Sequence, residues 1–384
     1  MEICVLNPFF YPYSGGTEKV LLEVYKRMAR KHNVTVISAV LNPRSKGKTE
    51  EIQGIKVVRL PAEYLNLPRF PMPYVIMKGL NRAIKDTHAD IYHINNRFQF
   101  MSNNVRAARS VGGKIAITLH NATPKNINLL TDSAGLVYDF ASGRRLIAEC
   151  DLITGISKNT IDTTVPRKLI PNTHVVYNGV DFKRFRPRKK NARMRSILQE
   201  LGIEGKIIMN NGRLIPQKGQ EYLLRAFAHF NSNNYADSSL LIIGRGYLAG
   251  YLNSLSRKLG ISDRFRIVTG ISEADLPLYY NLSSTFVMPS VYEPASVALL
   301  EGMSSSIPTI ASRVGGMPEM MKDGGFYFKP KSTKALYKQL CYVFSGDRNI
   351  KERARRSRKI IIKEHNWDII AKTYSRLFEE TIKQ

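Results

Sequence analysis

Two glutamates eight residues apart, Glu293 and Glu301, have the spacing in this chain that points most directly to chemistry. The apolar run 284–290 predicts a buried parallel strand, and 295–303 predicts a helix. Glu293 then lies in the strand-to-helix turn, and Glu301 lies about two turns along the helix. Open α/β sheets bind ligands at this carboxyl edge. An acid in the turn and a second one on the helix suit the hydroxyls of a sugar and a ribose.

The start of that expected helix adds hydrogen-bond donors. Amides in the first turn of a helix lack intrahelical partners and can hold an anion. We therefore expect contacts to a phosphate at Ser296, Val297 and Ala298. An ordinary surface helix with two chance glutamates also fits the pattern. The following strand, 307–310, and the glycine-rich turn 313–319 favour the functional interpretation.

Two cations five residues apart lie on a second glycine-flanked turn. Gly212, Arg213 and Lys218 follow the expected strand 206–211 and precede a helix that reaches about residue 231. A guanidinium fork and an ammonium at a helix start can clamp a diphosphate, although a solvated surface pair is the alternative. A further glycine-rich turn at Gly244 follows the next expected strand.

The amino-terminal half repeats the same design. Gly15 and Gly16, in a loop that includes Ser14, separate the expected strand 2–6 from a helix over 18–31 that Thr17 would cap. The dinucleotide pattern G-x-G-x-x-G is absent, which removes the main support for hydride chemistry. Three polar side chains follow expected strands and can reach a ligand: His93, Asn95 and His120.

Alternating strands and helices predict an α/β fold with two doubly wound sheets. A chain of 384 residues with 43% hydrophobic residues fits two domains. The expected boundaries are a first domain over 1–180, a basic linker over 181–204 and a second domain over 205–365.

Several of these motifs together resemble the retaining family-4 glycosyltransferases. The matching strings are E-x7-E from Glu293 with G-G-x-P-E at 315–319, G-R-x-x-x-x-K-G at 212–219, the strand ending in His120, and the segment 175–181. The resemblance implies GT-B architecture: two Rossmann-like domains facing a cleft, with the last helix, about 366–384, completing the first domain. One departure is that Pro294-Ala295-Ser296 stands where the family has an aromatic residue and glycine. The serine in place of glycine is expected to add a side chain where the backbone would cradle the donor.

The resemblance also implies residue roles. Transfer from a nucleotide-sugar with retention would place Arg213 and Lys218 on the diphosphate, Glu293 on the donor sugar and Glu301 on the ribose. His120 would position the sugar. The nucleobase is expected near Thr269. The acceptor-side residues would be His93 and Asn95, and glycines 15, 16, 212 and 244 would line the donor. No D-x-D motif is present, so neither metal nor cofactor is expected.

The net charge of +27 indicates an anionic partner. A basic nucleic-acid-binding protein would explain the charge but not the paired acids, and a sugar phosphorylase or nucleotide-sugar epimerase would keep the clamp. The proline-led stretch 64–77 predicts an apolar helix, either buried or lying on a membrane surface. With three scattered cysteines and no signal peptide or membrane span, we expect a cytoplasmic protein. A lipid-linked or sugar acceptor at the inner membrane face is a further expectation.

Overall fold

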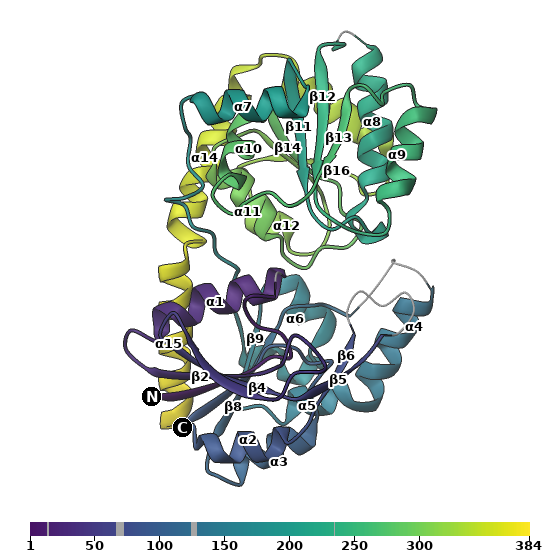
Figure 1. The fold of residues 1–384 in the computed structure, drawn as a ribbon. Helices are drawn as coiled ribbons and strands as arrows, with labels where there is room; N and C mark the ends of the chain where they lie inside the picture. Colours follow the sequence, from purple (N-terminus) through teal and green to yellow (C-terminus); the bar gives the residue numbers. More distant parts are fainter. Residues whose placement is uncertain (14, 67–72, 124–128, 234) are drawn as a thin grey trace. The chain divides into compact units, whose positions relative to one another are not determined.

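The computed structural model describes residues 1–13, 15–66, 73–123, 129–233 and 235–384, which form two compact units (Figure 1). Unit 1 comprises Met1–Asn178 together with Trp367–Gln384, and unit 2 comprises Gly179–Asn366. Residues 181–204, for which we expected a linker, group with unit 2 and include helix α7 (Ala192–Leu201).

Unit 1 is built on an eight-stranded sheet with the order β10-β9-β8-β7-β1-β2-β4-β3. Only β3 pairs antiparallel among these described strands. The strands are β1 (Glu2–Leu6), β2 (Asn33–Ala39), β3 (Lys48–Ile52), β4 (Ile55–Leu60), β7 (Ile91–Ile94), β8 (Lys114–Leu119), β9 (Leu152–Gly155) and β10 (Thr173–Val175). Because β1, β7 and β8 are parallel neighbours, the residues that follow them meet at one edge.

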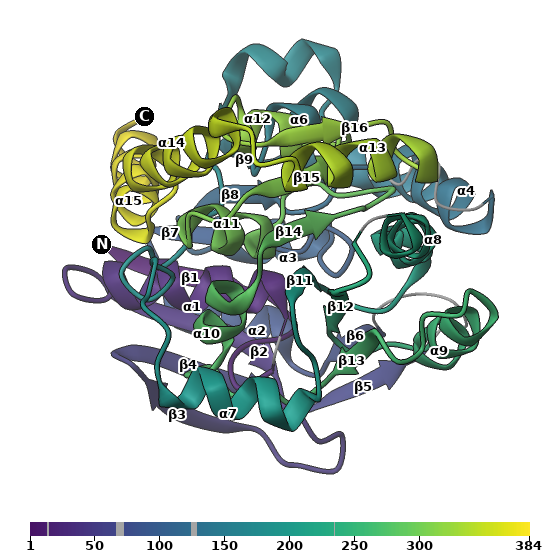
Figure 2. The same cartoon turned by 90° about the horizontal axis from the view of Figure 1, so that it is seen from above.

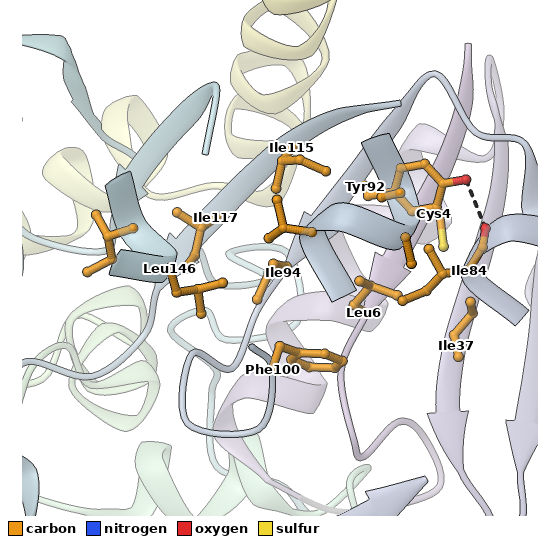
Figure 3. Packing of buried hydrophobic residues seen from close by; sticks show 14 of the residues in the cluster. Cys4, Leu6, Ile37, Ile84, Tyr92, Ile94, Phe100, Ile115, Ile117 and Leu146 are labelled. Atoms are coloured by element: carbon orange, nitrogen blue, oxygen red, sulfur yellow. Dashed lines mark hydrogen bonds between the residues drawn. The ribbon is translucent and has the colours of Figure 1, made fainter. Parts of the chain in front are cut away.

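Helices cover both faces of this sheet. They are α1 (Gly16–Met28), α2 (Leu80–Thr87), α3 (Ser102–Arg109), α4 (Leu129–Tyr138), α5 (Arg144–Ala148), α6 (Lys158–Thr164) and α15 (Trp367–Lys383), with the π-helix η1 (Asp139–Gly143) and the 3-10 helix η2 (Arg167–Asn172). One core lies between the sheet and α2, α3 and α5, where Tyr92 donates to the Ile84 carbonyl at 2.9 Å (Figure 3). Successive residues of a strand point to opposite faces of the sheet. The residues before and after each of these core positions therefore point to the other face.

The carboxyl-terminal helix α15 lies on the opposite face, beside α1 (Figure 1). Arg27 Nε donates to Asp368 Oδ1 at 2.7 Å, and His32 Nε2 lies 2.7 Å from Ser375 Oγ. These contacts span more than 300 residues of sequence, so α15 is an integral layer of unit 1.

Unit 2 has a parallel six-stranded sheet with the order β13-β12-β11-β14-β15-β16. Its strands are β11 (Lys206–Asn211), β12 (Ser238–Ile243), β13 (Phe265–Val268), β14 (Thr285–Met288), β15 (Thr309–Ser312) and β16 (Phe326–Phe328). Its other helices are η3 (Pro216–Lys218), α8 (Gln220–Ser232), α9 (Ala249–Lys258), α10 (Leu276–Leu282), α11 (Val297–Ser304), α12 (Met317–Met321), α13 (Thr333–Phe344) and α14 (Arg348–Glu364). Helices α8, α9 and α13 cover one face, and α7, α10, α11 and α14 cover the other (Figure 2). The predicted pair of doubly wound α/β sheets is confirmed.

Three local predictions were wrong. The end of the proline-led stretch, expected as an apolar helix, forms strand β6 (Tyr74–Met77), which pairs with β5 (Ala62–Leu65) in a hairpin. Val75 and Met77 are buried while Ile76 is exposed, which is the alternation of a strand. Residues 67–72 of that stretch lie outside the described residues. Strand β3 was missed, and Gly15 rather than Thr17 is the N-cap of α1.

Candidate active site

The turn between β14 and α11 holds the first glutamate of the pair in a buried cluster. Glu293 is only 6% exposed. Its Oε2 accepts hydrogen bonds from Lys218 Nζ and, at 3.1 Å, from Ser290 Oγ. The carboxylate is therefore fixed in place and its charge is offset by the ammonium group. Sequence reasoning named Glu293 and Lys218 but missed Ser290, whose position three residues before the acid was an available signal.

Helix α11 begins immediately after this cluster. Ser296 is its N-cap, and the Ser296 hydroxyl accepts from the Leu299 amide at 3.2 Å. The amides of Val297 and Ala298 have no acceptor within the described part of the chain. The serine that departs from the family pattern thus turns its side chain toward its own helix. Two first-turn amides remain as donors to an anion.

The second glutamate is held by a neighbouring helix. Glu301 is 2% exposed, and its Oε2 lies 2.9 Å from the Tyr280 hydroxyl, which donates to it. Asn211 Nδ2 donates to the same hydroxyl at 3.1 Å. Burial, and then the charge of Glu301, raises the pKa of Tyr280 well above its usual value, so the hydroxyl stays protonated and remains a donor. Tyr280 and Asn211 were not predicted, because nothing in their local sequence marks them.

The glycine-rich turns after β11 and β12 contact each other through their backbones. A Cβ on Gly244 would lie 2.0 Å from the Gly212 carbonyl oxygen, and one on Gly246 would lie 2.3 Å from the Leu214 carbonyl oxygen. The glycines are therefore required for packing of the two turns. Arg213, which follows Gly212 in the first of these turns, is exposed and has no ion partner among the residues described. Thr269, which follows β13, is also exposed.

The glycine-rich turn at residues 313–319 packs against the backbone of Glu293. Gly315 has φ +53°, and a Cβ there would lie 2.0 Å from the Glu293 carbonyl oxygen. The Gly316 amide donates to that carbonyl at 3.3 Å. Pro318 then occupies the first turn of α12, where no amide hydrogen is needed. The G-G-x-P-E string thus fixes the backbone on which Glu293 is carried.

In unit 1 the ends of β7 and β8 bring Asn95 and His120 together. The His120 Nε2 lies 3.1 Å from Asn95 Oδ1, and Asn95 Nδ2 donates to the His93 carbonyl at 3.1 Å. Since the amide oxygen only accepts, His120 carries its proton on Nε2. Burial lowers the pKa of His120 to about 4, so the ring is neutral near pH 7.

His93 does not fit the acceptor-side role expected for it. Its side chain is 1% exposed and points to the sheet face that α1 and α15 cover. The ring bonds the Tyr25 hydroxyl through Nδ1 and Thr118 Oγ1 at 2.6 Å through Nε2, and it meets Phe378 edge-on at 5.2 Å between centroids. Burial, with the charge of His120 second, lowers the pKa of His93 to about 3. His93 is therefore a neutral core residue.

The glycines at the start of α1 are also less open to an anion than expected. A Cβ on Gly15 would lie 2.0 Å from Glu18 Oε2, so this buried carboxylate already lies against the turn. A negative ligand would meet a like charge there. Gly16 begins the helix, and its Cβ direction is open. Ser14 lies outside the described residues.

In the described parts of the chain, no set of three or more His, Cys, Asp or Glu side chains is arranged to hold a metal ion. No helix in those parts combines the length and apolar character needed to cross a bilayer.

Comparison with known proteins agrees with these elements. Residues 195–379 match the model of the glycosyl transferases group 1, and residues 14–184 match that of glycosyltransferase family 4. An uncharacterized glycosyltransferase of Methanocaldococcus jannaschii is 30% identical over 52% of this chain and 51% of its own length. A GDP-mannose-dependent alpha-(1-6)-phosphatidylinositol monomannoside mannosyltransferase of Mycolicibacterium smegmatis is 25% identical over 82% of this chain and 81% of its own.

A solved structure gives the fold. Anabaena HepE, crystallised with UDP-glucose, superposes with a TM-score of 0.76 over 98% of this chain and 99% of its own, at 16% identity. The two Rossmann-like sheets and the structural match define a GT-B fold, and the family matches identify a glycosyltransferase that uses a nucleotide-sugar donor. The chain belongs to the family-4, group 1 glycosyltransferases.

Proposed function

We propose that this chain transfers a glycosyl group from a nucleoside diphosphate sugar to an acceptor hydroxyl, with retention of configuration and without a metal ion. The observation that carries the proposal is the cluster of buried Glu293 and Ser290 with partly buried Lys218, directly before the amino terminus of α11. An acid, a cation and free amides there suit a sugar joined to a diphosphate.

The leaving diphosphate is stabilised by groups that are already in place. Lys218 supplies a positive charge, and the amides of Val297 and Ala298 supply donors at the helix start. Arg213 offers an exposed guanidinium that has no ion partner among the described residues. Preorganised charge of this kind is usually the largest contribution to catalysis. These groups do the work that a divalent ion performs in metal-dependent transferases.

The remaining residues orient the donor. Glu293 accepts hydrogen bonds from sugar hydroxyls, and Glu301, fixed by Tyr280, accepts from the ribose. His120 donates a hydrogen bond from its Nε2–H to Asn95 Oδ1, so its Nδ1 is left as an acceptor for a sugar hydroxyl. A neutral imidazole positions the sugar without adding a like charge to an oxocarbenium-type transition state. Retention follows if the acceptor attacks from the face that the diphosphate leaves.

The relatives support the donor class and leave its base open. The mycobacterial relative is named for GDP-mannose, whereas the Anabaena structure contains UDP-glucose. The acceptor is a sugar hydroxyl, on a lipid-linked or a polysaccharide carrier.

The test is thermal melting with a panel of nucleoside diphosphates and their sugars in excess chelator, since a ligand of the folded state raises the melting temperature. We expect one base to give the largest shift, Arg213→Ala to reduce it, and Arg225→Ala, an exposed arginine on α8, to leave it unchanged. The selected donor is then incubated with acceptors and the product anomer read by NMR. No shift with any nucleotide, a strict metal requirement or an inverted product would each refute a part of the proposal.

A further inference from the structure

The end of α4 and the start of η1 expose an unusual amount of apolar side chain. Leu136, Val137 and Phe140 are 60%, 66% and 86% exposed, and Phe140 is the most exposed large hydrophobic residue in the described chain. Positions three and four apart share one face of a helix, and Phe140 lies three residues after Val137 and four after Leu136, so Phe140 joins the two into one patch across α4 and η1. Solitary exposed apolar residues are common, but such a cluster calls for a partner.

The opposite side of the same segment is firmly anchored. Asp139, 5% exposed, forms a buried ion pair with Arg97 and accepts from Thr123 Oγ1 at 2.5 Å. The Tyr138 hydroxyl donates to the Arg97 carbonyl. These bonds tie η1 to the loop after β7, the strand end that carries Asn95. The outward direction of the patch is therefore set by packing.

Charge identifies the occupant. Arg144 is exposed in the first turn of α5, directly after the patch, and has no ion partner in the described chain. The whole chain carries +27. A second copy would bring the same positive field to the interface and be repelled, whereas an anionic surface is attracted. Aliphatic and aromatic side chains beside arginine are the composition of a segment that lies in a lipid headgroup layer.

We propose that Leu136, Val137 and Phe140 insert into the headgroup layer of an anionic lipid bilayer, with Arg144 on its phosphates. The patch lies on the segment bonded to the loop after β7, so docking brings the strand ends with Asn95 and His120 near the bilayer, where a lipid-linked acceptor resides. The docking does not depend on the transfer reaction, so vesicle binding and transferase activity can fail separately.

The test is sedimentation of the full chain with vesicles of phosphatidylcholine, alone or mixed with phosphatidylglycerol. We expect binding to the anionic vesicles only. Phe140→Ser should weaken this binding roughly ten- to hundredfold, because the bilayer no longer buries an aromatic side chain. Arg144→Gln should weaken it by a smaller factor. Tyr247→Ser removes a side chain of similar exposure, 73%, from unit 2 and should leave binding unchanged.

A second readout locates the inserted residue. The chain has one tryptophan, Trp367, which is 2% exposed, so its emission provides a constant background. Phe140→Trp should shift to the blue on binding and be quenched by lipids brominated in the acyl chain. The proposal is overturned if the wild type ignores anionic vesicles or if Phe140→Ser binds them equally. It is also overturned if binding is lost equally on Lys359→Glu in α14 or if the patch instead mediates a dimer that Phe140→Ser dissociates. Salt-sensitive RNA binding that Phe140→Ser weakens, without lipid binding, would assign the patch to nucleic acid.

Discussion

Unit 1 should lose stability steeply between neutral and mildly acidic pH because two buried histidines resist protonation. The pKa of His93 is lowered from 6.5 to about 3, and that of His120 to about 4, chiefly by burial. The unfolded chain therefore binds more protons than the folded one at intermediate pH. The stability is intact above a pH of about 6.5 and decreases as the pH falls toward the folded-state values.

The magnitude follows from proton linkage. At about pH 5 an unfolded histidine of pKa 6.5 is almost fully protonated, whereas His93 is almost fully neutral in the fold. The difference favours the unfolded chain by about 2 kcal/mol relative to pH 7, and His120 adds about 2 kcal/mol more. Replacing His93 with glutamine keeps hydrogen-bonding groups near Tyr25 and Thr118 but removes the titration. His93→Gln should therefore reduce the loss of unfolding free energy between about pH 7 and pH 5 by about 2 kcal/mol. Any packing that the variant loses lowers its stability equally at every pH and does not affect this difference.

Urea unfolding followed by tryptophan emission measures this directly, because the single tryptophan, Trp367, lies at the start of α15 in unit 1. The matched control is His174→Gln, which replaces an exposed histidine on β10 of the same unit. This variant should lose as much unfolding free energy between about pH 7 and pH 5 as the wild type does. If wild type and His93→Gln lose the same free energy between about pH 7 and pH 5, His93 titrates normally and the burial argument is refuted.

Three further predictions concern unit 2. Gly244→Ala should destabilise it by roughly 1–3 kcal/mol in urea melts, since its Cβ would meet a carbonyl oxygen at 2.0 Å, whereas Gly250→Ala, with open space around its Cβ, should not. Ser296→Ala should cost about 1 kcal/mol of stability through the lost cap, while the rise in melting temperature caused by a nucleotide should stay unchanged. If that rise is lost as well, the hydroxyl binds the ligand. Glu301→Gln should weaken binding of a nucleoside diphosphate by roughly ten- to hundredfold by calorimetry, and unchanged affinity would remove this residue from the ribose site.

The sequence predicted those features whose signal is local. Apolar runs ended by glycine or proline placed β11, β12 and β14 within a residue or two, because a buried parallel strand is apolar on both faces. The pairing of Lys218 with Glu293 was not predicted as a contact, yet both residues were chosen from their turns. The turns are at the same sheet edge because β11 and β14 are parallel neighbours.

What the sequence could not predict depends on partners distant in the chain. His93 ends a strand in the same way as a ligand-binding residue would, but Phe378, which covers it, lies on a helix 285 residues later. Tyr280 supports Glu301 from α10 across a helix-to-helix contact, which no spacing rule describes. Nothing in the local sequence marks Phe140, in η1, as exposed, and only the packed fold shows that it is.

The departure at Ser296 shows how a local rule can be right about a residue and wrong about its consequence. A serine in place of glycine was expected to put a side chain into the donor cradle. Serine is also a preferred N-cap, and its hydroxyl takes the Leu299 amide, an interaction within the helix itself. The cap uses only the Leu299 amide, the third of the helix, and the amides of Val297 and Ala298 remain available to a ligand. The serine therefore stabilises the start of α11, and its hydroxyl bonds within the helix while the two amides that we propose as anion donors stay available.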